Sequence, residues 1–517
     1  MGEFASQSYR NDGFRASLGG TDKGGGPPCQ RGGATRMTLC CICGNLPFLT
    51  GCNRTGTDNW NSARSVGQVR HGLLLEGRAM APTVGKTLKD KATAKSVPEA
   101  APKAAKDAHP VSPLAPKSLA KLQPISGVRL GTGAAGIRYE GRTDVLMGVF
   151  AAGTTVAGVF TKSKTSSSPV DWCKSALTEK SARALVVNSG NANAFTGRVG
   201  LDAVKATVEC VSAMMGCKSH EVFIASTGVI GEPLPVKRLT AALPEIYENS
   251  GATAWEQAAR AIMTTDTFPK MATATAQIDG LPVRINGIAK GSGMIAPDMA
   301  TMLSFVFTDA TLPQDVLQAL LVQSAEISFN SITVDGDTST SDTLLLFATG
   351  KGARHNPVLR ANDKRLDDFR VKLNSLMQDL AVQVVRDGEG ATKLIRINVS
   401  GAENSVAARK IALSVANSPL VKTAIAGGDA NWGRVVMAVG KSGEAANRDK
   451  LSIKFGGHRV ATQGLRDPNY SEALMVRYMQ RGEIEIDIDV GIAKGSAGVW
   501  TCDLTHGYIS INGDYRS

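Results

Sequence analysis

One stretch of the sequence combines the residue types that a self-activating nucleophile needs. Residues 286–305 read NGIAKGSGMIAPDMATMLSF and place Thr301 after a glycine-rich approach and the small Ala300, at the start of an apolar run. A threonine at a newly exposed chain start can use its own α-amino group as a base, because the pKa of that group is about 7.7–8. Its hydroxyl would first attack the preceding carbonyl, and water would cleave the resulting ester. Thr301 is therefore a candidate nucleophile, and a threonine that simply begins a strand is the ordinary alternative.

Histidine-based catalysis has little support in this chain. None of the six histidines lies in a glycine-rich or nucleophile-elbow segment, so a Ser-His-Asp triad is disfavoured.

The hexapeptide GIAKGS occurs at 287–292 and again at 491–496, but only the first copy continues into GMIAPDMATML. We interpret the first copy as the approach to the nucleophile and the second as ordinary strand material.

The composition indicates a globular protein whose positive charge lies mainly outside the folded body. The chain has 517 residues, 43% of them hydrophobic and 5% aromatic, and a formal net charge of +12. No window approaches the roughly 18 uninterrupted apolar residues of a membrane span. Residues 1–80 hold nine Lys and Arg against five acids, and 81–124 hold eight Lys against three acids, which leaves about +3 for 125–517. Basic tails without interleaved aromatic residues are weak evidence for nucleic-acid binding, so we expect neither a nucleic-acid nor a membrane partner.

The first 124 residues differ in composition from the rest. Residues 1–79 contain five of the nine cysteines and lack helical or strand periodicity, so we predict a disordered leader that the folded protein does not need. The run CCICGNLPFLTGC lacks the second paired set of a zinc site, and it lacks the basic start of a lipoprotein signal. Residues 80–124 are rich in Ala, Lys and Pro, which predicts a flexible linker.

From about residue 125 the hydrophobic pattern is that of a mixed α/β protein. Apolar runs typical of strands occur at 144–161, 184–188, 222–227, 303–308, 343–349 and 394–400. Patterns with helical periodicity occur at 201–214, 252–264, 314–328 and 365–386. The alternation in EIEIDIDV predicts one half-buried strand of an antiparallel sheet. The first strand is not followed by the glycine-rich loop of a dinucleotide fold, and the four body cysteines form no disulfide or metal pattern, which fits a reducing cytoplasm.

Seven segments together carry a resemblance to a known family. They are VVNSGNANAFTG (186–197), STGVIGEPLP (226–235), IMTTDTFPK (262–270), KGSGMIAPDMATML (290–303), RDGEGATK (386–393), GGDANWGR (427–434) and the ending INGDYRS. In this order, over about 125–517, they are similar to the ornithine acetyltransferase (glutamate N-acetyltransferase) family. The resemblance implies an α/β layered sandwich similar to N-terminal-nucleophile hydrolases, and a precursor that cuts itself into an alpha chain, 125–300, and a beta chain, 301–517.

The resemblance also assigns catalytic roles to single residues. Thr301 matches the family's nucleophile, and Ala300 and Thr301 match its cleavage site. Thr227 and Gly228 match the pair that stabilises the oxyanion, and a hydroxyl and a backbone N–H at a strand-end turn suit that role. Without the other motifs, TG alone would indicate only a turn.

Other residues match the positions that contact substrate. These are Thr267, Lys290, Thr301, Glu389, Asn512 and Ser517. Lys290 and Glu389 would supply a cation for a substrate carboxylate and an anion for a substrate ammonium, although the resemblance does not decide which residue serves which group. Ser517 is the last residue, so it would contribute only if the tail folds back over the site. Asp298 stands where the family usually has asparagine, and this extra charge could alter the rate of self-cleavage.

The resemblance implies transfer of an acetyl group from N2-acetyl-L-ornithine to L-glutamate through an acetyl-Thr301 intermediate, a cytoplasmic step of arginine biosynthesis. It implies no cofactor or metal, and a heterotetramer of two alpha and two beta chains. No residue decides whether acetyl-CoA is also a donor, or whether the leader targets an organelle. One alternative is a self-processing aminopeptidase or amidase of related fold, against which GGDANWGR and DGEGATK argue. A catalytically silent scaffold is the other, and retention of Thr301, Thr227 and Gly228 argues against it.

Overall fold

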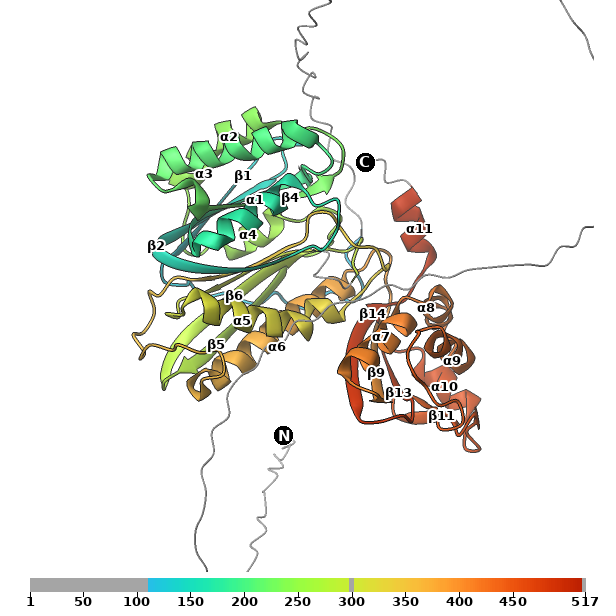
Figure 1. The fold of residues 1–517 in the computed structure, drawn as a ribbon. Helices are drawn as coiled ribbons and strands as arrows, with labels where there is room; N and C mark the ends of the chain where they lie inside the picture. The colour runs from blue at the N-terminus through green and yellow to red at the C-terminus, as the bar shows by residue number, and fades with distance from the viewer. Residues whose placement is uncertain (1–109, 297–301, 514–517) are drawn as a thin grey trace, which may run out of the picture. The chain divides into compact units, whose positions relative to one another are not determined.

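Two β-sheets, each packed against helices, make up the folded part of the chain. The computed structural model describes residues 110–296 and 302–513, and Figure 1 shows how their helices and strands are arranged. The described residues therefore have the mixed, layered α/β architecture that the sequence predicts.

The larger sheet has eight strands in the order β4-β3-β2-β8-β7-β6-β5, with β1 paired to β2. Its strands are β1 (Val128–Gly133), β2 (Val145–Phe160), β3 (Ser181–Asn191), β4 (Val222–Val229), β5 (Lys270–Ile278), β6 (Leu281–Lys290), β7 (Leu303–Thr308) and β8 (Thr343–Ala348). β7 and β8 are parallel, with Leu303 opposite Thr343. The starts of these two strands therefore lie side by side.

Helices cover this sheet because its central strands are apolar on both faces. The helices of this part are α1 (Ser168–Ala176), α2 (Gly197–Met215), α3 (Val236–Glu248), α4 (Trp255–Ala261), α5 (Gln314–Glu326) and α6 (Asp367–Arg386). Every residue of β7 and β8 is buried, as expected for strands covered on both sides. Leu344 and Leu346 pack with α5 and α6, whereas Leu345 and Phe347 pack with α1 and α4.

The smaller sheet has six strands in the order β12-β11-β10-β13-β9-β14. Its strands are β9 (Leu394–Ala402), β10 (Ser452–Phe455), β11 (His458–Thr462), β12 (Leu465–Arg466), β13 (Glu483–Asp489) and β14 (Gly495–Cys502). The accompanying helices are α7 (Ser405–Ala416), α8 (Pro419–Ala426), α9 (Trp432–Gly440), α10 (Glu472–Tyr478) and α11 (His506–Gly513). In the motif GGDANWGR, the Asn431 side chain accepts a hydrogen bond from the backbone N–H of Arg434 and caps α9. This motif therefore has a structural role.

Most of the predicted strands are confirmed, and two details of the prediction are wrong. The six apolar runs form β2, β3, β4, β7, β8 and β9, and EIEIDIDV forms β13. The sheet around β13 is mixed, because β13 pairs antiparallel with β10 but parallel with β9. The second GIAKGS copy begins as a bend at 491–494 and enters strand β14 only at Gly495. Alternation identifies a strand but carries no information about the direction of its neighbours.

The segment that leads into the larger sheet is packed against it. The prediction of a flexible linker over 80–124 is wrong for 110–124. Leu114 is only 8% exposed and joins the core beneath α5 and α6. The backbone N–H of Ser112 donates to Thr267 Oγ1 at 3.0 Å, and the Ser112 hydroxyl donates to the last carbonyl of α6 at 2.6 Å. These contacts, with hydrogen bonds from Arg284 and Asn286 to the carbonyls of Pro124 and Gln123, hold a segment that its composition alone marks as flexible.

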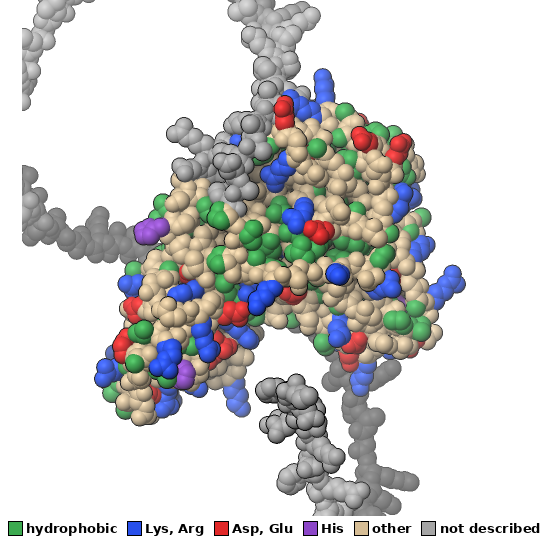
Figure 2. All heavy atoms as spheres, turned by 180° about the vertical axis from the view of Figure 1, so that it is seen from behind, with side chains coloured by type: hydrophobic (Ala, Val, Ile, Leu, Met, Phe, Trp, Pro, Cys, Tyr) green, Lys and Arg blue, Asp and Glu red, His purple; other side chains and the backbone are tan. Residues whose placement is uncertain are grey.

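The remaining predictions about the start of the chain concern residues without a described structure. The leader, 1–79, and residues 80–109 lie outside the described residues. None of the described helices is long and apolar enough to cross a membrane. On the face drawn in Figure 2, Lys and Arg side chains are interspersed with Asp and Glu.

Candidate active site

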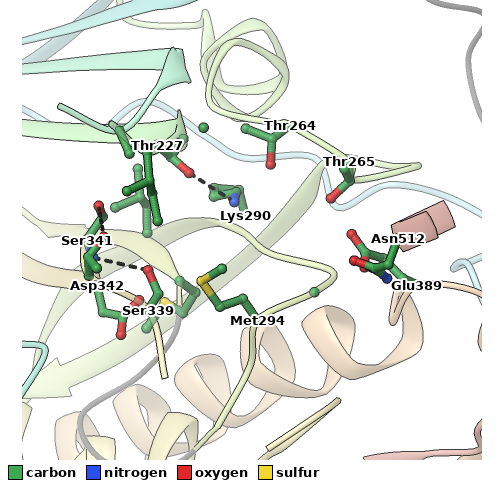
Figure 3. Close-up of a pocket in the computed structure, with 17 residues that line it drawn as sticks. Thr227, Thr264, Thr265, Lys290, Met294, Ser339, Ser341, Asp342, Glu389 and Asn512 are labelled. Carbon is green, nitrogen blue, oxygen red and sulfur yellow. Dashed lines mark hydrogen bonds between the residues drawn. The ribbon is translucent and has the colours of Figure 1, made fainter. Parts of the chain in front are cut away.

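A cavity of about 160 Å³ lies where several strands of the larger sheet begin or end. The ends of β4 and β6, the starts of β7 and β8, the loop after α6, and α11 all contribute to its wall. Figure 3 shows Glu389 and Asn512 together at one end of the cavity and Ser339, Ser341 and Asp342 at the other, with Lys290 between them. Segments that are distant in the sequence are therefore brought together at one site.

Thr227 and Gly228, the predicted oxyanion donors, lie at the end of β4 and line the cavity. The Thr227 hydroxyl oxygen accepts a hydrogen bond from Lys290 Nζ at 3.2 Å. A hydroxyl oxygen can accept one hydrogen bond while its own hydrogen donates elsewhere. The Thr227 hydrogen can therefore be directed at a ligand oxygen in the cavity, where burial strengthens such a bond.

The end of β4 is held against the neighbouring strand β3. Gly228 has φ +129°, and a Cβ there would lie 2.3 Å from the carbonyl carbon of Gly190, so only glycine permits this approach. Next to it, the Ser226 hydroxyl donates to Asn188 Oδ1 at 2.6 Å, and Asn188 Nδ2 donates to the Asn191 carbonyl at 2.8 Å. The asparagines of VVNSGNANAFTG thus fix the strand end that carries the oxyanion donors.

Lys290 is a buried cation at the end of β6. Its side chain lines the cavity and is only 8% exposed. Burial lowers the pKa of its ammonium below the usual value, and the Asp266 carboxylate is the main group that raises it. Lys270 lowers this pKa further, while Glu389 and Asp342 raise it. The charge of Lys290 therefore depends on the acids around it.

A fully buried ion cluster adjoins Lys290. Lys270 Nζ lies 2.6 Å from Asp266 Oδ1 and 2.6 Å from Asp387 Oδ2, and all three side chains are 0% exposed. Burial alone would raise the pKa of Asp266, but the ammonium groups of Lys270 and Lys290 hold it below its ordinary range. The pKa of Asp387 is raised, because its burial outweighs the effect of Lys270. None of these three residues was predicted from the sequence as a site residue.

Glu389 and Asn512 form the other end of the cavity. Asn512, on α11, donates through Nδ2 to Glu389 Oε2 at 2.8 Å, and the backbone N–H of Glu389 donates to the Ser292 carbonyl at 2.9 Å. Both side chains line the cavity, and their contact with substrate stays a prediction. The wall here offers an anion at some distance along the cavity from the Lys290 cation (Figure 3).

Thr267 does not line the cavity. Its backbone N–H donates to Asp387 Oδ2 at 2.9 Å, and its hydroxyl donates to the other oxygen of the same carboxylate. The Thr267 hydroxyl oxygen also accepts from the backbone N–H of Ser112. In this structure Thr267 therefore orders the buried cluster, and its contact with substrate stays a prediction.

Several predicted site residues lie outside the described residues. These are Ala300, Thr301, Asp298 and Ser517. The nearest described residues after the predicted cleavage site, Met302 and Leu303, do line the cavity. The roles of Thr301 as nucleophile and of the Ala300–Thr301 bond as cleavage site stay predictions.

Asp342 is a cavity residue that the sequence analysis missed. It immediately precedes β8, is 2% exposed, and has one carboxylate oxygen, Oδ2, without a hydrogen-bond partner among the described residues. Burial raises the pKa of this carboxyl well above its usual value, although the Ser339 hydroxyl, the Lys290 ammonium, the Thr161 hydroxyl and the N–H of Met302 lower it. The polar run TSTSD before the apolar strand TLLLFA was the available signal, because β8 starts beside β7.

The site contains the chemical groups that an enzyme needs to transfer an acyl group from one amino acid to another. Oxyanion donors, a cation and an anion line one small cavity, so a ligand with a carboxylate and an ammonium could be held with an acyl carbonyl near Thr227. Within the described ranges, no group of three or more His, Cys, Asp or Glu is arranged to hold a metal ion.

Comparison with known proteins gives concordant matches. The model of the ArgJ family matches residues 129–517. Proteins called arginine biosynthesis bifunctional protein ArgJ from Agrobacterium fabrum and Rhizobium meliloti are each 59% identical over 409 residues, which cover 79% of this chain and 99% of each relative.

Solved structures are similar over a smaller part of the chain. An arginine biosynthesis bifunctional protein ArgJ from Bacillus halodurans is 38% identical, with 40% of this chain and 96% of that chain covered and a TM-score of 0.38. An ornithine acetyltransferase from Mycobacterium tuberculosis, solved in complex with ornithine, is 33% identical, with 35% of this chain and 96% of that chain covered and a TM-score of 0.31.

Proposed function

The chain belongs to the ArgJ family, and on this premise we propose that it is a glutamate N-acetyltransferase of arginine biosynthesis. The reaction moves the acetyl group of N2-acetyl-L-ornithine to L-glutamate and gives L-ornithine and N-acetyl-L-glutamate. The observation that carries the proposal is one cavity lined at once by Thr227, Gly228, Lys290, Glu389 and Asn512. These residues come from four different segments of the chain.

The proposed nucleophile is Thr301, freed by self-cleavage after Ala300. The Thr301 hydroxyl attacks the acetyl carbonyl carbon of acetylornithine while the α-amino group of Thr301 takes the hydroxyl proton. The Thr227 hydroxyl and the Gly228 N–H stabilise the negative oxygen of the tetrahedral intermediate. When the carbon–nitrogen bond breaks, the proton passes to the ornithine nitrogen and ornithine leaves. The amino group of glutamate then attacks the acetyl ester and restores the Thr301 hydroxyl.

Substrate is held by two opposite charges, Glu389 at one end of the cavity and Lys290 near its middle (Figure 3). We assign the Lys290 ammonium to a substrate carboxylate and the Glu389 carboxylate, which Asn512 orients, to the side-chain ammonium of ornithine. Thr267 and Ser517 belong to the proposed substrate contacts on the resemblance alone. No cofactor or metal takes part in the proposed reaction.

The order of substrate binding tests the covalent intermediate. Since ornithine must leave before glutamate binds, initial-rate plots at several fixed glutamate concentrations should be parallel. Incubation with acetylornithine alone should add one acetyl mass to the chain that begins with Thr301. Intersecting plots without an acetylated chain would indicate direct transfer in a ternary complex. Release of acetate without glutamate would instead indicate a self-processing amidase, and an uncut, inactive protein would indicate a silent scaffold.

The role of Glu389 can be tested in the same assay. Glu389→Gln keeps the shape of the side chain but removes its charge, so KM for acetylornithine should rise more than KM for glutamate, whose side chain carries no cation. Glu256→Gln, which removes an exposed carboxylate on α4, is the matched control and should change neither. Equal losses for both substrates would remove Glu389 from this role while leaving the covalent mechanism intact.

Finer properties belong to the same proposal. The word bifunctional in the names of the relatives supports acetyl-CoA as a second acetyl donor, which assay with acetyl-CoA and glutamate would test. We also propose a heterotetramer of two alpha and two beta chains, measurable by light scattering. A cytoplasmic location is supported by the free state of Cys173, Cys210, Cys217 and Cys502.

A further inference from the structure

The buried ion cluster beside the cavity has no part in the chemistry described so far. Lys270 is enclosed between two carboxylates, Asp266 and Asp387, each 2.6 Å from its Nζ. Taking three charges out of water is costly, and well-packed apolar side chains would often be at least as stable. A cluster of this kind next to a reaction site therefore calls for a role beyond packing.

The two carboxylates differ in what else they bind. Asp266 Oδ1 also accepts the backbone N–H of Gly291 at 2.6 Å, directly after Lys290 in the chain. Asp387 instead accepts the backbone N–H and the hydroxyl of Thr267. Only Asp266 is thus tied to the segment that carries Lys290.

Lys290 in turn connects this cluster to the oxyanion donor. Its Nζ donates to Thr227 Oγ1 at 3.2 Å. The charged groups that act on it are Asp266 in the loop before β5, Lys270 at the start of β5, Glu389 after α6, and Asp342 before β8. Among these, Asp266 gives the largest support to the charged form against the cost of burial.

We propose that Asp266 is a positioning residue for acyl transfer, which keeps the buried Lys290 ammonium charged and directed at the hydroxyl oxygen of Thr227. Because the Thr227 oxygen already accepts a hydrogen bond from Lys290, the Thr227 hydrogen points at the developing oxyanion. The nearby positive charge of Lys290 strengthens this second hydrogen bond, from Thr227 to the oxyanion. This role rests on the proposed acetyl transfer and adds a second task for Lys290 besides binding a carboxylate.

The two carboxylates supply a matched pair of variants. Asp266→Asn and Asp387→Asn are the same isosteric change, and each removes one of the two carboxylate charges paired with Lys270. Of the two, only Asp266 also binds the segment that carries Lys290. We expect Asp266→Asn to lower kcat about 10-fold or more with a smaller change in KM. Since Asp266 raises the pKa of Lys290, its loss should move the alkaline limb of the kcat profile to lower pH. In Asp387→Asn that limb should stay where it is in the wild type.

A double-mutant cycle separates this role from general stabilisation. If Asp266 acts through Thr227, Asp266→Asn should cost little further kcat in a Thr227→Ala background. An alkaline limb that does not move in Asp266→Asn, or that moves equally in both aspartate variants, would overturn the proposal. A full additional loss in the Thr227→Ala background would do the same.

A second variant keeps the test decisive if Asp266→Asn does not fold. Lys290→Met has a similar length and leaves the Lys270 cluster intact. In this background Thr227→Ala should cost much less than it costs in the wild type, and the alkaline limb should disappear. An unchanged cost of Thr227→Ala would show that Lys290 does not act through Thr227. Absence of acetyl transfer by the wild-type enzyme would instead contradict the proposed function itself.

Discussion

The hydroxyl oxygen of Thr227 accepts a hydrogen bond from Lys290, and its own hydrogen can donate to a ligand oxygen. Thr227→Ala removes the donated hydrogen bond, so we expect kcat to fall by about 100- to 1000-fold. KM should change much less, because the bond strengthens mainly in the transition state. Thr227→Ser keeps the hydroxyl and should recover most of the loss. Steady-state kinetics of the two variants check this, and near-normal kcat in the alanine variant would place the donor elsewhere.

The buried carboxylate of Asp342 lowers the stability of the folded protein. Its carboxyl is buried beside the cavity, Oδ2 has no partner among the described residues, and burial raises its pKa. A carboxyl with a raised pKa in the folded state destabilises the protein at pH values above its unfolded pKa, and the penalty is complete above the folded value.

Asp342→Asn should therefore raise Tm at neutral and alkaline pH. The gain should shrink as pH falls and vanish below about pH 3, where the carboxyl is protonated in both the folded and unfolded states. Thermal unfolding of both proteins across this pH range is the measurement. A variant that is less stable at pH 8 would mean that Asp342 has a stabilising partner, such as a cation supplied by Thr301 after cleavage.

Sequence predicted the site residues that stand in recognisable motifs, and it missed those that only the fold brings together. Thr227, Gly228, Lys290 and Glu389 were identified within short segments and do line one cavity. Asp266 and Asp387 stand in IMTTDTFPK and RDGEGATK, but they are far apart in the sequence and meet only across a buried lysine. A charged residue in a motif gives no sign of its burial, so its energetic role cannot be inferred without the structure.

At the scale of elements, apolar runs were sufficient to locate strands but not to pair them. β7 and β8 were predicted as strands, but their parallel contact, which places Asp342 beside the predicted nucleophile segment, was not. Segment 110–124 was missed for a related reason, because the contacts that hold it against the sheet are made with residues far away in the sequence. The pairing of a strand and the packing of a segment against a sheet depend on residues elsewhere in the chain, about which a local sequence pattern carries no information.

The close contact between the ends of β3 and β4 requires glycine at 228. Gly228→Ala would place a Cβ 2.3 Å from Gly190 backbone, so the two strand ends would have to separate. Gly231→Ala is the control, because Gly231 also has positive φ, +86°, but a Cβ added there would meet nothing within 4 Å. We expect about 1–2 kcal/mol of destabilisation for the control and clearly more for Gly228→Ala, measured by urea denaturation. Equal losses would show that the strand ends move apart freely.

At the scale of the whole molecule, the folded unit extends further towards the N-terminus than composition suggests. A chain that begins at Met80 should fold and turn over like the full chain, because the leader lacks the apolar periodicity that would offset its ordering entropy. A chain that begins at residue 125 should have a lower Tm, since it loses the buried Leu114 and the hydrogen bonds of Ser112. Leu114→Ala alone should cost about 2–5 kcal/mol. A Met80 start that is insoluble would make the leader a structural element.

Cleavage before Thr301 would divide the larger sheet between two chains. β6 belongs to the first chain and β7 to the second, and they pair over Ile285–Lys290 and Leu303–Thr308. β8 of the second chain likewise pairs with β2 of the first. Neither chain could leave without exposing central strands that are buried on both faces, so the two cut chains should stay together as long as the sheet is folded.

The purified protein should therefore migrate as one species under native conditions and as two chains on a denaturing gel. N-terminal sequencing of the smaller chain should read TMLSFVF, which begins at Thr301. Thr301→Ala removes the hydroxyl that attacks the preceding carbonyl, so it should remain one chain and lack activity, while its native size and Tm stay close to those of the wild type. A cut at another bond, or efficient cutting of the alanine variant, would contradict the assignment of Thr301. Separation of the chains without denaturant would contradict the shared sheet instead.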